Sequence, residues 1–196
     1  MNDVMTAGLD EVGRGSWAGP LCVAVAVFKP NTPRIEGVRD SKKLSARKRE
    51  ELVRPILEAA QFIGFGWASP GYIDEHGLTD AWHMACRAAL EHAPAEEMHL
   101  IVDGRDEVRG YDGVQNAMEK ADDLYYPVSA ASIVAKVARD LDMVRMDEHY
   151  PGYMWSQNAG YGTKQHKDGI FERGLTPYHR RGFLKKWAAK VGFELT

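Results

Sequence analysis

The sequence has few cysteines, no long hydrophobic run and no strong net charge, and each shortage excludes a class of protein. Its 196 residues include only Cys22 and Cys86, neither of them in a C-x-x-C motif, which excludes a disulfide framework. The longest apolar run, LCVAVAVF at 21–28, is too short to span a bilayer. The N-terminus lacks the basic and apolar regions of a signal peptide. We therefore expect a cytoplasmic protein that does not contact a membrane.

Histidine spacing excludes a further class of site. The seven histidines are scattered, with no H-x-x-x-H or His/Cys spacing, so we expect no zinc site and assign no role to His166 or His179. There is also no internal repeat, low-complexity tract or long linker. We predict a single domain over residues 1–196, with a core at about 1–150 and a helical, substrate-binding segment at about 151–196.

Positive charge is concentrated in two segments of a chain whose formal net charge is −3. Residues 160–190 hold eight Lys/Arg against two Asp/Glu, and residues 39–54 hold seven against three. Each segment is either a solvated helix face or a surface for a polyanion. Taken alone, the pattern favours the solvated face. It favours the polyanion surface only when an acidic, metal-holding cluster is found beside it.

Hydrophobic patterning predicts an α/β fold, with a sheet of mixed direction covered by helices. Ser45 is the expected N-cap of the first helix, within which Pro55 bends or interrupts the second half, and Ser129 is the expected cap of the longest helix. That helix should bury Ile133, Val137, Leu141 and Val144 along one face. The predicted strands are 4–10, 19–28, 62–69, 98–104 and a weaker one at 114–119; the predicted helices are 46–60, 79–93, 130–150, 163–173 and 180–190.

Acidic residues follow several of these strands. Asp10 and Glu11 end the first strand, Asp103 ends another, and Asp122 and Asp123 precede the longest helix. Gathered at strand ends, such carboxylates form a site for hard divalent cations such as Mg²⁺. Neighbouring strand residues point to opposite faces. Either the strand ends early at Asp10, which the following glycines favour, or Glu11 reaches the cation from the side or through its carbonyl.

Six sequence blocks resemble the ribonuclease HII family, the type 2 group of ribonucleases H. They run in order from residue 8 to residue 183. The blocks are GLDEVGRGSWAGP (8–20), DSKKLSARKRE (40–50), LIVDG (100–104), KADDLYYPVSAASIVAKVARD (120–140), GYGTKQH (160–166) and TPYHRRGF (176–183).

The resemblance implies a ribonuclease H-like fold, with a mixed five-stranded sheet flanked by helices and a helical C-terminal segment. It implies an endonuclease that cleaves the RNA strand of RNA–DNA hybrids and single ribonucleotides in duplex DNA, leaving 5′-phosphate and 3′-hydroxyl ends. The implied acidic tetrad is Asp10, Glu11, Asp103 and Asp122, with Asp123 beside the last. It would hold two Mg²⁺ or Mn²⁺ ions, about 3.5–4 Å apart, for phosphodiester hydrolysis.

Substrate contacts follow from the same resemblance. Gly13, Arg14 and Gly15 form the turn that senses the ribose, and Tyr161 packs against the sugar. Glycine lets the backbone approach the 2′-hydroxyl closely. Lys42 and Lys43 are candidate phosphate contacts, the alternative being an exposed basic turn.

Two alternative functions stay open at this point. A non-catalytic hybrid-binding module would lack the full tetrad, and another two-metal nuclease, such as a junction resolvase, would lack the Gly-Arg-Gly turn and Tyr161. The sequence departs from the family at 104–114, GRDEVRGYDGV, and carries no Gln-x-x-apolar-x-x-aromatic-aromatic tail. We therefore expect no binding to a sliding clamp. We also expect a monomer.

Overall fold

The computed structural model describes residues 4–95 and 98–195, and the chain divides into two compact units. The first unit is Met1–Val12, Cys22–Trp67 and His83–Val137; the second is Gly13–Leu21, Ala68–Trp82 and Ala138–Thr196. Two helices, α2 (Pro70–Leu90) and α4 (Tyr126–His149), contribute residues to both units. Among the described residues, no helix is both long enough and apolar enough to cross a membrane.

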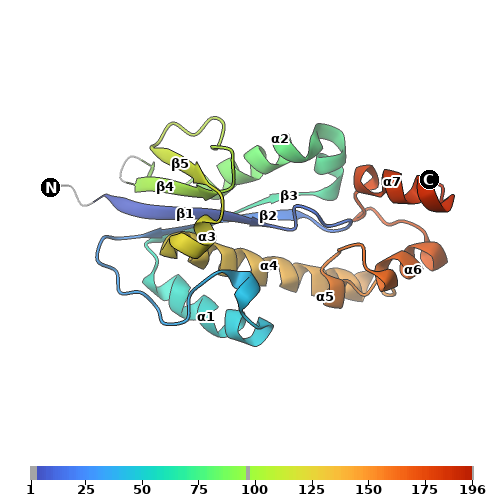
Figure 1. The fold of residues 1–196 in the computed structure, drawn as a ribbon, viewed down its shortest axis with the longest axis horizontal. Helices are drawn as coiled ribbons and strands as arrows, with labels where there is room; N and C mark the ends of the chain where they lie inside the picture. The colour runs from blue at the N-terminus through green and yellow to red at the C-terminus, as the bar shows by residue number, and fades with distance from the viewer. Residues whose placement is uncertain (1–3, 96–97, 196) are drawn as a thin grey trace. The chain divides into compact units, whose positions relative to one another are not determined.

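A five-stranded sheet forms the centre of the first unit (Figure 1). The strand order is β3 (Phe62–Ala68), β2 (Leu21–Phe28), β1 (Met5–Val12), β4 (Met98–Asp103) and β5 (Gln115–Met118). Strand β1 runs antiparallel to β2 and parallel to β4, which is itself parallel to β5. This arrangement confirms the predicted mixed five-stranded sheet.

Helices cover both faces of this sheet. In Figure 1, α1 (Ala46–Ala59) and the first part of α4 lie over one face, and the last part of α2 lies over the other. Every residue of β2 is buried, as its continuous apolar run predicts. On the α1 and α4 side, alternate β2 residues pack against apolar residues of the two helices; this core includes Cys22, Ala24, Ala26, Phe28, Leu52, Ile56, Ile133 and Val134.

The second unit is built from helices and loops around an aromatic core. Its short helices are α5 (Trp155–Asn158), α6 (Lys164–Arg173) and α7 (Arg181–Val191). The last two confirm the helices predicted at 163–173 and 180–190. The buried core residues are Ala18, Met143, Tyr153, Trp155, Ile170 and Leu184.

The prediction for the helix at 79–93 was incomplete. Helix α2 already begins at Pro70 and is interrupted by a non-helical Gly77 before continuing to Leu90. Ser69 accepts a hydrogen bond from the Tyr72 N–H (3.2 Å). The Ser-Pro pair therefore both ends β3 and starts a helix, because proline is well tolerated in the first helical turn.

The predicted start and face of the longest helix were wrong. Helix α4 begins at Tyr126, and the buried Ser129 hydroxyl instead donates to the carbonyl of Asp122 (2.7 Å). Leu141 and Val144 are exposed, because the helix passes from the sheet-covering unit to the other unit and its buried side changes. Helix α1, in contrast, begins at the predicted cap and continues through Pro55 without interruption.

Candidate active site

Three carboxylates meet in the first unit. Asp10 lies on β1, Asp103 is the last residue of the neighbouring parallel strand β4, and Asp122 lies on the short helix α3 (Ala121–Leu124). Each offers an oxygen atom, and these atoms lie within 4.8 Å of one another. Asp103 also accepts a hydrogen bond from the Ala121 N–H (2.8 Å), which ties α3 to the end of β4.

The three carboxylates repel one another where Asp10 and Asp122 are buried and Asp103 is partly buried. Burial, followed by the negative charge of Glu11, raises the pKa of Asp10 well above its ordinary value. Burial and the charge of Asp103 likewise raise the pKa of Asp122 to about 6. A divalent cation would remove this repulsion, and oxygen ligands of this kind are those that Mg²⁺ and Mn²⁺ prefer. The chemistry of the donor set therefore fits a hard divalent cation.

Glu11 lies outside the three-carboxylate group. Strand β1 continues to Val12, with Glu11 paired to Val23 of β2, so the expected early end of the strand at Asp10 was wrong. In regular β-structure the side chain of Glu11 points away from that of Asp10. Its backbone N–H donates to the Asp10 carboxylate (2.7 Å), so Glu11 contacts the cluster through its backbone.

Asp122 and Asp123 have different surroundings. Asp122 is buried within the carboxylate group, whereas Asp123 is ion-paired with the partly exposed Lys43. Lys42 lies 3.8 Å from the Asp122 carboxylate, with 79% of its side chain exposed. Partial burial acts to lower the pKa of Lys42, but Asp10, Asp122 and other carboxylates raise it overall. Lys42 therefore stays a cation next to the acidic cluster.

The Gly-Arg-Gly turn belongs to the second unit, where it lies beside Tyr161. The carbonyl of Gly13 accepts a hydrogen bond from the buried Ser16 hydroxyl (2.9 Å). A Cβ atom on Gly15 would meet only the Tyr161 ring, at 4.0 Å, an ordinary contact, and the backbone of Gly15 is not left-handed. Neither backbone geometry nor crowding within the protein demands a glycine at position 15. Its missing side chain leaves open space in front of Tyr161, whose exposed fraction is 41%.

Gly13 is glycine for a different reason. Its φ of +86° is a left-handed conformation that other residues rarely adopt, and a Cβ there would lie 2.1 Å from Nε of Arg139. Arg139 is fully buried and donates to the carbonyls of Pro20 (2.8 Å) and Ala159 (2.9 Å) and to the Ser16 hydroxyl (2.8 Å). The turn is thus built on a buried arginine that the sequence pattern did not mark as part of the site.

Comparison with known proteins shows which family the chain belongs to. The family model described as ribonuclease HII matches residues 7–188. The chain belongs to the ribonuclease HII family. It is 44% identical to a ribonuclease HII from Clostridioides difficile over 91% of this chain and 69% of that protein.

Solved structures agree with this family membership and with the predicted ribonuclease H-like fold. Ribonuclease H2 from Pyrococcus horikoshii superimposes with a TM-score of 0.81 and 28% identity, over 97% of this chain and 100% of that one. The ribonuclease HII in the PCNA:RNase HII complex from Archaeoglobus fulgidus gives a TM-score of 0.76 and 28% identity, over 90% and 94% of the two chains.

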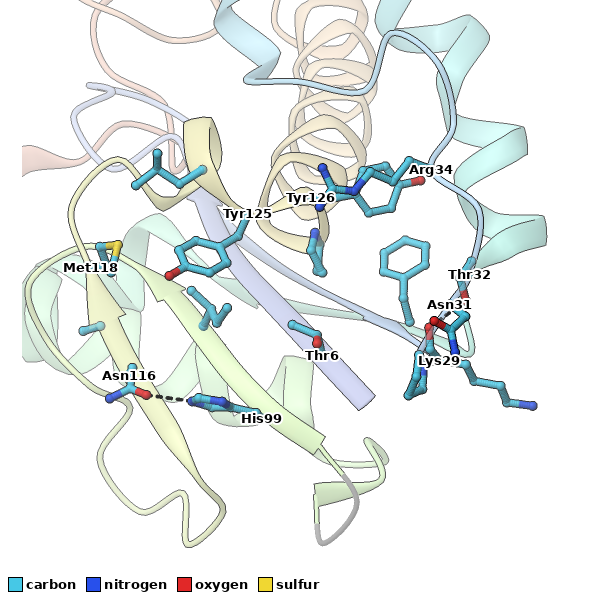
Figure 2. A pocket seen from close by; sticks show the side chains of 16 residues that line it. Thr6, Lys29, Asn31, Thr32, Arg34, His99, Asn116, Met118, Tyr125 and Tyr126 are labelled. Atoms are coloured by element: carbon cyan, nitrogen blue, oxygen red, sulfur yellow. Dashed lines mark hydrogen bonds between the residues drawn. The ribbon is translucent and has the colours of Figure 1, made fainter. Parts of the chain in front are cut away.

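One cavity of this ribonuclease HII family member is lined by none of the three carboxylates. It has a volume of about 620 Å³, lies in the first unit and shares no lining residue with the predicted site (Figure 2). Figure 2 shows Tyr125 and Tyr126 on one side of it and the hydrogen-bonded pair His99 and Asn116 (2.7 Å) on another. This cavity therefore does not coincide with the predicted site, which rests on the geometry of the carboxylates instead.

Two buried histidines that the sequence left without a role support the Tyr161 loop. The Tyr161 carbonyl can only accept, so Nδ1 of His166 donates to it (3.0 Å) and Nε2 accepts from the Trp155 indole N–H (3.0 Å). Nδ1 of His179 accepts from the Thr176 N–H (2.9 Å), and its Nε2 lies 3.2 Å from Nε2 of His166. Both rings are therefore neutral, each in one defined tautomer.

Lowering the pH should destabilise the folded protein through these two histidines. Burial lowers the pKa of His166 below its ordinary value, and burial together with His166 lowers that of His179 to about 3. A histidine whose pKa is lower in the folded state stabilises the fold fully above its unfolded pKa of about 6.5, and this contribution is lost as the pH falls. The free energy of unfolding should drop by up to ~1.4 kcal/mol per histidine for each pH unit below about 6.5.

Urea unfolding between pH 7.5 and pH 5 measures this dependence. In His179→Asn the side-chain oxygen can still accept from the Thr176 N–H, but nothing titrates at that position. This variant should show a shallower decrease than wild type. Parallel curves for the two proteins would contradict the assignment.

Proposed function

We propose that this ribonuclease HII family member, an endonuclease that cleaves the RNA strand of RNA–DNA hybrids, also cleaves at single ribonucleotides embedded in duplex DNA. The products carry 5′-phosphate and 3′-hydroxyl ends. The reaction is hydrolysis of a phosphodiester bond and depends on Mg²⁺ or Mn²⁺. The observation that carries the proposal is the group of three carboxylates whose oxygen atoms lie within 4.8 Å of one another.

Asp10, Asp103 and Asp122 hold the cations in this proposal, and Glu11 completes the tetrad through its backbone carbonyl or from the side, by a shift of its side chain. Two such cations would activate a water molecule and stabilise the departing 3′-oxygen. The raised pKa values of Asp10 and Asp122 support this role, because a cation relieves the repulsion that raises them. Lys42 and Lys43 contribute positive charge for the phosphate backbone.

The second unit selects the sugar. Gly13, Arg14 and Gly15 present backbone groups to the 2′-hydroxyl, the group that distinguishes RNA from DNA. Tyr161 packs against the ribose, and the open space above Gly15 supports this role. The helical segment at about 151–196, which carries Tyr161, is the substrate-binding part of a single catalytic domain. The junction-resolvase and binding-module alternatives are not favoured, because the sequence carries the carboxylates of the tetrad together with the Gly-Arg-Gly turn and Tyr161.

Three further expectations accompany the proposal and stay predictions. They are a cytoplasmic location, a monomeric state and the absence of sliding-clamp binding. Analytical ultracentrifugation, and a binding assay with a sliding clamp, test the last two.

Substitution of neighbouring aspartates tests the ligand assignment. Asp122→Asn should reduce cleavage of a single-ribonucleotide duplex by at least ~100-fold, since removing one charged ligand removes several kcal/mol of transition-state stabilisation. Asp123→Asn, the matched control one residue away, should stay within about threefold of wild type because Asp123 is paired with Lys43. The reverse ranking would place the fourth ligand at Asp123.

Cation binding has a readout that does not require activity. Added Mg²⁺ or Mn²⁺ should raise the Tm of EDTA-treated protein, because a ligand that binds only the folded state stabilises it. The shift should be much smaller in Asp10→Asn and Asp103→Asn. An equal shift in wild type and in both variants would show that the cations bind elsewhere.

A further inference from the structure

We propose that Arg180 is a positioning residue for ribose recognition: its buried guanidinium fixes the peptide plane that directs the Gly15 N–H outward to the 2′-hydroxyl. This inference rests on the proposed function of the Gly-Arg-Gly turn. Arg180 immediately precedes α7 and is fully buried within the second unit.

Arg180 ties together the loop that follows β1. Its Nη1 donates to the carbonyl of Arg14 (3.0 Å) and its Nε donates to the carbonyl of Gly19 (3.0 Å). Its backbone N–H donates to the carbonyl of Trp17 (2.7 Å). Through these bonds, one residue from the C-terminal part of the chain determines the path of residues 14–19.

The start of α7 is itself held in place. The carboxylate of Asp74 accepts from the backbone N–H groups of Arg181 (2.7 Å) and Gly182 (2.9 Å). A carboxylate is favourable at a helix N-terminus, where N–H groups are otherwise unsatisfied. The Arg180 side chain also packs on the ring of Phe183, 5.4 Å from its centroid. Arg180 is therefore a fixed point against which the turn is built.

The bond to the Arg14 carbonyl sets the direction of the next N–H group. The peptide between Arg14 and Gly15 is trans, and the C=O and N–H of a trans peptide point in opposite directions. With its carbonyl directed at the buried guanidinium, this peptide presents the Gly15 N–H on the side away from Arg180. Gly15 is exposed, and among the described residues its N–H has no hydrogen-bond partner. It is a donor placed for a ligand.

Arg180 keeps its charge in these surroundings. Burial and the nearby Arg139 lower the pKa of Arg180 to about 9, while the carboxylate of Asp74 acts in the opposite direction. Arg180 thus remains a cation at neutral pH. Its Nη2 is buried without a hydrogen-bond partner in the described part of the chain. The guanidinium is therefore held through Nε and Nη1, which donate to the carbonyls of Gly19 and Arg14. The Arg14–Gly15 peptide of the proposed ribose site is thus bonded to a buried cation.

Binding measured without cleavage distinguishes a positioning role of Arg180 from a role in protein stability alone. Dissociation constants are measured in EDTA for two duplexes that differ only in one 2′-hydroxyl, an all-DNA duplex and the same duplex with a single ribonucleotide. Wild type should prefer the ribonucleotide duplex by about tenfold, as one hydrogen bond to the 2′-hydroxyl provides. In Arg180→Met, which cannot donate, the preference should fall close to one while all-DNA binding changes little.

Two more variants complete the test. Arg180→Lys keeps the charge, but a lysine lacks the fixed fork of donors that bonds two carbonyls, so its preference for the ribonucleotide duplex should also lie below that of wild type. If Arg180→Met does not fold, Arg180→Lys is the variant that tests the proposal. Leu184→Ala removes a fully buried apolar α7 side chain, which makes no hydrogen bond to the turn, and should keep the wild-type preference despite lower stability.

The outcomes distinguish this inference from the function on which it rests. A folded Arg180→Met with the wild-type preference would overturn it, as would an equal loss of preference in Leu184→Ala. A wild type that binds both duplexes equally would instead overturn ribose reading by the turn, and the positioning role with it.

Discussion

Asp10→Asn should abolish cleavage and at the same time make the cation-free protein more stable. Asparagine keeps the shape of the side chain but removes the charge that a divalent cation needs, so the rate should fall by at least ~1,000-fold, or about 4 kcal/mol in the activation barrier. The same charge destabilises the folded protein without a cation, because Asp10 is buried beside Glu11 and Asp103. Loss of activity and gain of stability from one substitution is not what a disrupted fold produces.

The sign of the stability change follows from the pKa of Asp10, which is higher in the folded protein than in the unfolded chain. Such a carboxyl contributes most stability below its unfolded pKa of about 3.9, and the contribution is lost as the pH rises through the folded pKa. In EDTA at pH 8 the Tm of Asp10→Asn should therefore exceed that of wild type, by about 2–4 °C for each kcal/mol of destabilisation that the substitution removes in a domain of this size.

Differential scanning fluorimetry in EDTA and a gel-based cleavage assay in Mg²⁺ measure the two effects. The difference in Tm should shrink as the pH is lowered toward 4. Asp140→Asn, a change to a carboxylate outside the cluster, is a suitable control. A less stable and inactive Asp10→Asn would mean that Asp10 is needed for the fold itself.

Gly15→Ala should reduce cleavage of a single-ribonucleotide duplex by roughly tenfold to a hundredfold without destabilising the protein. The folded chain has room for the added methyl group, whose nearest neighbour would be the Tyr161 ring at 4.0 Å. The methyl group would occupy the space proposed for the ribose, and overpacking of this kind costs ~1–3 kcal/mol. Stability should be unchanged or higher by about 0.4–1 kcal/mol, because alanine restricts the unfolded chain.

Two other glycines provide matched controls. Gly13→Ala introduces a strained left-handed alanine and a clash with Arg139, so it should lower the Tm as well as the activity. A Cβ on Gly71 meets nothing within 4 Å, so Gly71→Ala should leave the activity unchanged and the Tm unchanged or slightly higher. Steady-state kinetics and thermal unfolding of the three variants give the comparison. A fully active Gly15→Ala would remove this turn from ribose recognition.

The sequence alone was sufficient to predict the sheet and most of the acidic cluster. Short-range signals determine these features: the apolar run of β2, an aspartate at the end of β4 and another two residues before the end of β1. The order of six motifs along the chain added the family and its activity. The geometry around Glu11 was not predictable, because strand pairing with Val23 of β2 outweighs the tendency of the following glycines to end the strand.

Sequence patterns did not reveal the buried residues that support the Gly-Arg-Gly turn and the Tyr161 loop, and the reason is physical. Arg180 and its neighbours lie in a basic segment that suggested a solvated, polyanion-binding surface, yet Arg180 and His166 are fully buried. Their burial depends on contacts with residues far away in the chain, such as the Arg14 carbonyl. Spacing in one sequence does not distinguish a buried arginine that donates to backbone carbonyls from an exposed one that binds phosphate.

The most direct test of the central claim is cleavage of one duplex at one ribonucleotide. The substrate is labelled at both ends of the strand that carries the ribonucleotide and compared with an identical all-DNA duplex, in Mg²⁺ and in EDTA. We predict a single cut at the ribonucleotide, leaving a 5′-phosphate and a 3′-hydroxyl, only in Mg²⁺ and only in the ribonucleotide duplex. Cleavage in EDTA would contradict a cation-dependent carboxylate site, and equal cleavage of the all-DNA duplex would contradict ribose selection.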